Sequence, residues 1–184
     1  MKDSFVISLL ADTLDKCAAI LAVELGVDSI PVVQKDQPTQ QGTNSAPTIF
    51  FQKLFDVPRG FPKATFGKDE ETGEWMDGIQ QAYETHFQIS VLNWQDPTNE
   101  NINTASDLVN GVFQLLMIES MRSTMKAKNL MVLRVDQVRN PSFENDKGQF
   151  EYHPNFDLVL THNAMRRIKI DTTEVVEGTI RFVP

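Results

Sequence analysis

The sequence predicts an α+β fold, in which a mostly antiparallel β-sheet of about six strands packs with two main helices. Apolar residues recur at helical spacing in residues 4–25 and 105–126, whereas between and after these segments they alternate with polar residues, as in half-buried strands. The later strand-like segments follow one another directly along the chain, which favours antiparallel pairing. The length and the 41% apolar fraction suit a single domain over residues 1–184.

Residues 4–25 are typical of an amphipathic helix that ends at Gly26. Its inward-facing positions are apolar or small, namely Phe5, Leu9, Leu10, Leu14, Cys17, Ala18, Leu21 and Leu25. Cys17 is the only cysteine of the chain, which excludes an intrachain disulfide and a cysteine-based zinc site. We interpret it as a buried, inert thiol.

The chain changes character after this helix. Residues 31–47 pass from a short IPVV run into a polar stretch that contains prolines. We interpret them as a loop or an arm, which is either flexible or ordered against a neighbour. A strand is predicted over residues 48–55. We expect no regular structure in residues 56–67, because two prolines and two glycines interrupt them.

An acidic hairpin loop is predicted at about residues 67–77, between two strand-like segments. Its carboxylates are Asp69, Glu70, Glu71 and Glu74. They lack the alternating spacing and the distal glutamate of a calcium loop, so a solvated hairpin tip is favoured over a metal site. We take this loop as the candidate surface that faces a channel or a partner protein.

A well-patterned strand over residues 83–91 leads, past Pro97, into the second helix. Thr104 with Asp107 three residues later predicts the N-cap of a helix that runs to about residue 126. This helix is apolar over most of its girth, and its apolar residues away from the main stripe include Val109, Phe113, Met117 and Met121. We predict that these four lie in a subunit interface, because one sheet cannot cover so wide an arc. The alternative is a central helix covered by the N-terminal one.

Further strands are predicted at residues 130–139, 150–160, 165–171 and 174–183, with a polar turn at 142–149. Arg166, Arg167 and Lys169 form the one notable basic cluster. The cluster could contact phosphate, but a salt bridge to the acidic loop across a subunit boundary is an equally good interpretation in an acidic protein. We therefore count these three residues with the subunit interface.

The sequence contains no pattern that points to catalysis. His86, His153 and His162 stand far apart, and none has a second metal-ligand type at helical spacing. No nucleophile elbow, phosphate-binding loop or dinucleotide-binding turn is present. We expect no enzyme activity, no cofactor and no metal. The alternative is a small hydrolase or ligand-binding domain that uses Glu84, His86 and Asp157.

Charge and hydropathy exclude further classes. The formal net charge of −8 argues against a basic groove for nucleic acid, although an acidic wall suits a channel through which DNA slides without sticking. No apolar run approaches the roughly 20 residues that a membrane-spanning helix needs, and the first residues lack the apolar centre of a signal peptide. We expect a protein made in the cytoplasm.

The order of these blocks resembles the neck or tail-terminator proteins of tailed bacteriophages, in particular the phage neck terminator gp12-like family. The resemblance covers nearly the whole chain. The segments that carry it are APTIFFQKLFDVPRGFP, QAYETHFQISVLNW, ASDLVNGVFQLLMIESMR, LMVLRVDQVRNP and FDLVLTHNAMRRIKIDTTEVVEGTIRF.

The resemblance implies a structural virion protein of the head-tail connector. Such proteins form a homo-oligomeric ring, with about six subunits, between the portal or adaptor on one side and the tail tube or sheath on the other. Double-stranded DNA passes through the axial hole without sequence-specific binding. A tail-tube or collar subunit of the same virion is the alternative within this class.

Overall fold

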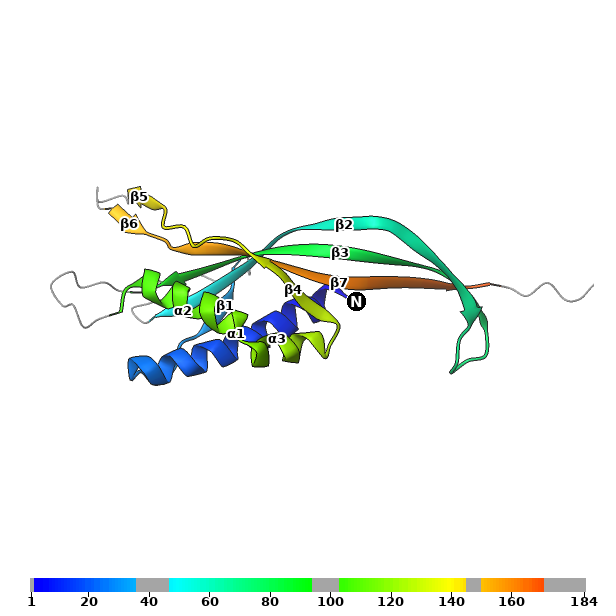
Figure 1. Cartoon of the computed structure of the whole chain (residues 1–184), viewed down its shortest axis with the longest axis horizontal. Coiled ribbons are helices and arrows are strands. Elements are labelled where there is room, and N and C mark those ends of the chain that lie inside the picture. The colour runs from blue at the N-terminus through cyan, green and yellow to red at the C-terminus, as the bar shows by residue number, and fades with distance from the viewer. Residues whose placement is uncertain (1, 36–46, 94–102, 145–149, 171–184) are drawn as a thin grey trace, which may run out of the picture.

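The computed structural model describes residues 2–35, 47–93, 103–144 and 150–170 (Figure 1). Its elements are α1 (Asp3–Leu25), β1 (Val32–Gln34), β2 (Thr48–Lys68), β3 (Trp75–Leu92), α2 (Ala105–Met117), α3 (Glu119–Lys126), β4 (Leu130–Val135), β5 (Ser142–Glu144), β6 (Phe150–Tyr152) and β7 (Asn155–Lys169). Most of the predicted arm at 31–47, the turn around Pro97 and the predicted strand at 174–183 lie outside the described residues.

Five strands form one sheet in the order β1-β2-β3-β7-β4, and β5 pairs with β6 in a separate two-stranded sheet. Only β1 and β2 run parallel, while the other neighbouring strands are antiparallel. The predicted α+β class with a mostly antiparallel sheet is therefore confirmed. The three central strands are long, with 21, 18 and 15 residues in β2, β3 and β7, and they extend well past the helices (Figure 1).

The three helices cover one face of the sheet at one end only (Figure 1). α1 packs against β1 and β2, α2 against β3 and β7, and α3 against β4. Between the two layers lies the core, whose largest fully buried side chains include Leu10, Leu14, Phe87, Ile89, Phe156 and Leu158. In β3 and β7 these core residues alternate with polar ones, as the sequence pattern predicted.

The wide apolar arc of α2 is covered from two sides within one chain. α1 lies against α2 so closely that a Cβ atom at Gly111 would come within 2.8 Å of Leu21 Cδ2. Val109 is fully buried in the core. The alternative, in which the N-terminal helix covers the central helix, thus explains the burial of Val109. The side chain of Val109 has no exposed surface that a neighbouring subunit could contact.

The N-terminus of α2 is as predicted, but the continuous helix to residue 126 is wrong. Thr104 Oγ1 accepts a 3.1 Å hydrogen bond from Asp107 N, and Asp107 Oδ2 accepts a 2.9 Å bond from Thr104 N, which completes a capping box. The helix ends at Met117, and Ile118 is extended, with ψ 137°. α3 then starts in a new direction, which buries Met125 completely beside β4.

The irregular segment predicted over residues 56–67 is wrong, since β2 continues through it to Lys68. Among the residues that the structure describes, β2 has a partner on its outer side only where β1 pairs with residues 49–51, so the rest of its length is a sheet edge there. Pro58 can lie there because its missing N–H removes no bond between strands. Gly60, with φ 65°, and Pro62 lie in a bulge, where the register with β3 shifts.

Other strand boundaries also differ from the predictions. β3 begins at Trp75, and β4 ends at Val135. β7 runs unbroken through the two segments that were predicted as separate strands, whereas Phe150–Tyr152 forms the short β6. The predicted polar turn at 142–149 begins with β5, which pairs with β6.

Candidate assembly interface

The central strands form a three-stranded ribbon beyond the helices, made of residues 56–68, 75–83 and 163–169 (Figure 1). Asp77 pairs with both Phe66 and Ile168, and the alternation places all three on the face that the helices cover farther along the sheet. Here that face is open, since Phe66, Ile79 and Ile168 are 71%, 54% and 67% exposed. The apolar side of the sheet therefore continues past its cover.

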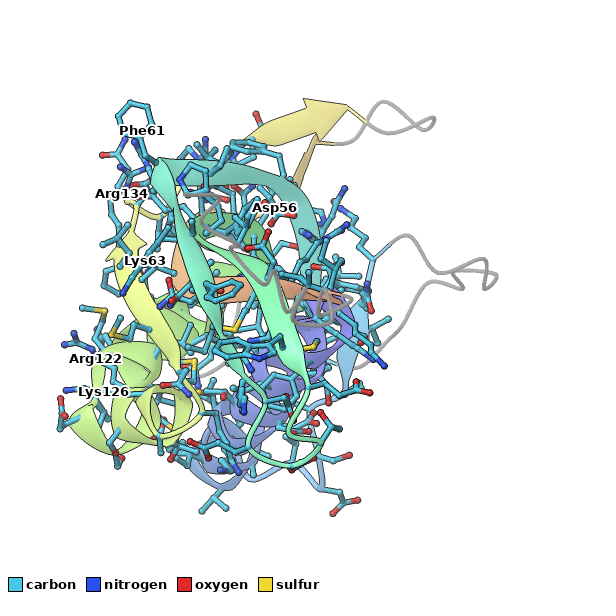
Figure 2. All side chains as sticks on the ribbon, turned by 90° about the vertical axis from the view of Figure 1, so that its right-hand side faces the viewer. Asp56, Phe61, Lys63, Arg122, Lys126 and Arg134 are labelled. Carbon is cyan, nitrogen blue, oxygen red and sulfur yellow. The ribbon has the colours of Figure 1, made fainter. Side chains whose placement is uncertain are left out.

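A shallow groove of about 260 Å³ lies on this uncovered side of the ribbon. Its lining is mainly apolar and includes Ile79, Tyr83, Ala164 and Ile168, with the guanidinium-bearing Arg166 among them. Phe61 lies at the bend of β2, where it is fully exposed and points away from the sheet (Figure 2). The ribbon thus offers a partner protein both an apolar groove and a protruding ring.

The predicted acidic hairpin loop is the turn between β2 and β3, at the tip of the ribbon. Asp69 Oδ1 accepts hydrogen bonds from the backbone N–H groups of Thr72 and Glu71, at 3.1 and 3.0 Å. These bonds stabilise the carboxylate and lower the pKa of Asp69. Gly73 has φ 70°, a conformation that favours glycine. Asp69 therefore shapes its own turn.

The predicted basic cluster reaches the acidic loop, but within one chain. Lys169 Nζ donates a 2.6 Å hydrogen bond to Glu74 Oε1, and Arg167 Nη1 lies 3.8 Å from Asp69 Oδ2. A salt bridge across a subunit boundary is therefore not required to pair these charges. Arg166 lies on the opposite face of β7, in the apolar groove.

The remaining predicted interface residues lie on α2 and α3. Phe113 is partly buried and packs edge-on against Phe156, with ring centroids 5.8 Å apart at 89°. Met121 is also partly buried against the core. Met117 and the neighbouring Ile118 are 43% and 48% exposed. Of the four apolar residues that were predicted to lie in a subunit interface on the second helix, Met117 has the most exposed surface.

The residues of the hydrolase alternative share one sheet face without forming a reactive group. Glu84 Oε2 accepts a 2.7 Å bond from Arg59, and Asp157 Oδ2 accepts a 2.6 Å bond from Arg139. The ring of His86 stacks on Phe55, with centroids 4.3 Å apart. Both carboxylates are therefore held by guanidinium groups. Among the described residues, no three metal-ligating side chains come together.

Three polar contacts were not evident from the sequence. Lys53 Nζ bonds to Asp3 Oδ1 at 2.5 Å and to Asp56 Oδ2 at 2.6 Å, which ties the start of α1 to β2. The buried ring of His162 lies 3.2 Å from Thr85 Oγ1 through Nε2. Burial lowers the pKa of His162, so the fold holds this imidazole neutral. Pairing across strands cannot be read from a sequence before the register is known.

None of the helices in the described part of the chain is both long and apolar enough to cross a membrane.

Comparison with known proteins places most of the chain in one family. Residues 5–172 match the family described as E217 gateway protein gp29. Among solved structures, the chain is similar to the sheath/tube terminator of an extracellular contractile injection system (PVC), determined by cryo-electron microscopy in the extended state. The sequence identity is 11%, the TM-score is 0.45, and the match covers 97% of this chain and 64% of the other. No curated protein matches the chain.

Proposed function

The chain belongs to the family described as E217 gateway protein gp29, and from this premise we propose that it is a structural subunit of the neck of a tailed bacteriophage. Copies of the chain form a ring that acts as a tail terminator or gateway. The ring joins the portal or adaptor to the tail tube or sheath, and DNA passes through its axial hole. The protein is made in the host cytoplasm and ends in the virion.

The observation that carries this proposal is the uncovered apolar side of the ribbon. An antiparallel sheet with one apolar and one polar face needs a cover for the apolar face. In this chain the helices cover only one end of the central strands (Figure 1). Phe66, Ile79 and Ile168 are the exposed part of that face. We assign the ribbon to the docking of a neighbouring virion protein, either the tail tube or sheath or the adaptor.

Identical chains surround a channel when cyclic symmetry closes their contacts without an exposed end. The number of about six subunits comes from the resemblance to neck proteins. The net charge of −8 supports the channel, since an acidic surface repels the phosphates of passing DNA and binds no sequence. The exposed carboxylates Glu70 and Glu71 at the ribbon tip are candidates for a channel-facing or partner-facing surface.

The test is to add the purified protein to polymerising tail-tube subunits. A terminator binds tube ends and stops growth, so electron microscopy should show capped tubes of limited length. Ile79→Glu should abolish capping, whereas Gln80→Glu, one residue along on the other face of β3, should leave it intact. Growth of long filaments from the purified protein alone would instead assign it as a tail-tube subunit. A ring that leaves tube growth unchanged would assign it to the collar.

A further inference from the structure

The helical layer has two opposite sides that differ in charge. In the sheet, β1 and β4 are the outer strands of the order β1-β2-β3-β7-β4. α1 packs against β1 and β2, and α3 packs against β4, so each helix marks one side of the molecule. The two sides are therefore available to different neighbours at the same time.

The side formed by α1 is acidic and partly apolar. A hollow of about 240 Å³ lies between α1 and the segment that leads to β1. Its rim carries the carboxylates of Asp15 and Asp28, and its wall carries Val23 and Val27, which are 82% and 37% exposed. Neither carboxylate forms an ion pair with another described residue. We call this surface the acidic side.

The side formed by α3 is partly apolar and carries a net positive charge, although the exposed Glu119 lies in the first turn of the helix. Arg122 and Lys126 are four residues apart, so they share one face of α3, and Lys128 follows the helix. All three are exposed, and none pairs with a described carboxylate. Met117 and Ile118 precede them as exposed apolar residues. Figure 2 shows Arg122 and Lys126 on the same side of the molecule as Arg134, which is already paired with Asp136. We call this surface the basic side.

We propose that the basic side of one subunit binds the acidic side of the next copy, and that this contact closes the ring; the proposal rests on the ring proposed above. Opposite charges that lack partners within the chain gain them in the neighbour, and exposed apolar side chains on both surfaces are covered together. Two copies of the same side would place like charges against each other. The contact therefore joins different surfaces, as a cyclic assembly requires.

Charge reversal on each side gives a sharp test. The variant Arg122→Glu/Lys126→Glu carries two acidic sides, and the variant Asp15→Lys/Asp28→Lys carries two basic sides. Each alone should lose self-association, because its like-charged sides repel. An equimolar mixture should assemble again, with the two variants alternating around an even-numbered ring. The measurement is the mass by light scattering after size exclusion, at low and at moderate salt.

Each variant has a control with the same change in net charge at a site outside both sides. Lys63→Glu/Lys68→Glu matches the first variant, and Glu70→Lys/Glu71→Lys matches the second. The controls should assemble like the wild type, because the ribbon and its tip are assigned to a different virion protein or to the channel and not to the next copy of this chain. We expect each test variant to weaken association by at least about a hundredfold, because like charges placed together cost several kcal/mol. Added salt should weaken assembly of the wild type, since the charges are exposed.

The outcomes separate this inference from the function. Assembly of the mixture, with neither variant assembling alone, supports the contact. A wild-type ring that survives both charge reversals overturns the contact and leaves the ring standing. A mixture that stays dissociated although the wild type assembles also overturns it. If neither the wild type nor the mixture associates at the highest soluble concentration, and neither forms a ring on isolated tail tubes, both the contact and the ring are wrong. Filaments in place of rings support the contact and contradict the terminator.

Discussion

Lys169 at the end of β7 and Glu74, the residue before β3, form a 2.6 Å ion pair within one chain. Together with the 3.8 Å approach of Arg167 to Asp69, the pair fastens the tip of the ribbon to its third strand. The basic cluster and the acidic loop thus satisfy each other locally. The ribbon tip reaches a partner as a pre-formed hairpin, which lowers the ordering entropy that binding would otherwise cost.

Replacing Glu74 by Gln should loosen the tip and leave the rest of the fold unchanged. Both partners are about half exposed, with side-chain exposures of 56% and 42%, so the loss of global stability should stay below about 1 kcal/mol. Amide hydrogen exchange should become faster in the turn at 69–74 and remain slow in the core strands. Glu70→Gln is the matched control. Equal exchange in the two variants would contradict the role of this pair.

Phe113 and Met117 should behave differently although both are apolar residues of α2. Phe113→Ala removes an edge-on contact with Phe156 and should lower the free energy of unfolding by about 2–3 kcal/mol. Met117→Ala should change it by less than about 0.5 kcal/mol, because that side chain is 43% exposed. Urea denaturation of both variants measures this difference. A large loss for Met117 with none for Phe113 would reverse the assignment of core and surface.

The fold class, the start of α2 and the hairpin tip were predictable because they depend on residues that are close together in the sequence. Alternation in β3 and the capping box of Thr104 and Asp107 are encoded by neighbouring residues. The resemblance to neck proteins of tailed phages is confirmed at the level of the family. The order of strand and helix blocks was sufficient for this, although no sharp motif was present.

Features that depend on tertiary pairing were not predictable. Pro58 and Pro62 predict the end of a strand when only the neighbouring residues are considered. The strand order of the sheet is needed to see that β2 is an edge strand there, where proline is tolerated. Ile118 ends α2 without a proline or glycine nearby. The interface prediction for Val109 was wrong because the position of α1 over α2 is a long-range contact. The sequence indicated the acidic loop as a partner of Lys169 and Arg167, but that these ion pairs form within one chain follows from the register of β3 with β7.

Thr104→Ala should destabilise the protein by about 1 kcal/mol, because the side chain that accepts the Asp107 N–H at the start of α2 is lost. Ser106→Ala is the control, since it lies in the same turn outside the cap. Thermal unfolding followed by circular dichroism compares them. The two variants should differ by several degrees in midpoint, and equal midpoints would contradict a contribution of the capping box.

Stability should fall as the pH drops below about 6.5. Burial lowers the pKa values of His162 and His153 from their ordinary value of 6.5, so the unfolded chain binds protons at a pH where the folded chain does not. The free energy of unfolding therefore decreases with falling pH through this window and levels off once the folded chain is also protonated. His162→Gln should reduce the slope, and adding His153→Gln should reduce it further. An unchanged slope in urea titrations at pH 5 to 7 would contradict this account.

The mass of the purified protein in solution, with negative-stain images of the same fraction, tests the central claim most directly. The account predicts one discrete annular species, about six times the 20.8 kDa of the chain. A protein that remains at 20.8 kDa at every concentration, and that forms no ring on isolated tail tubes, would contradict it.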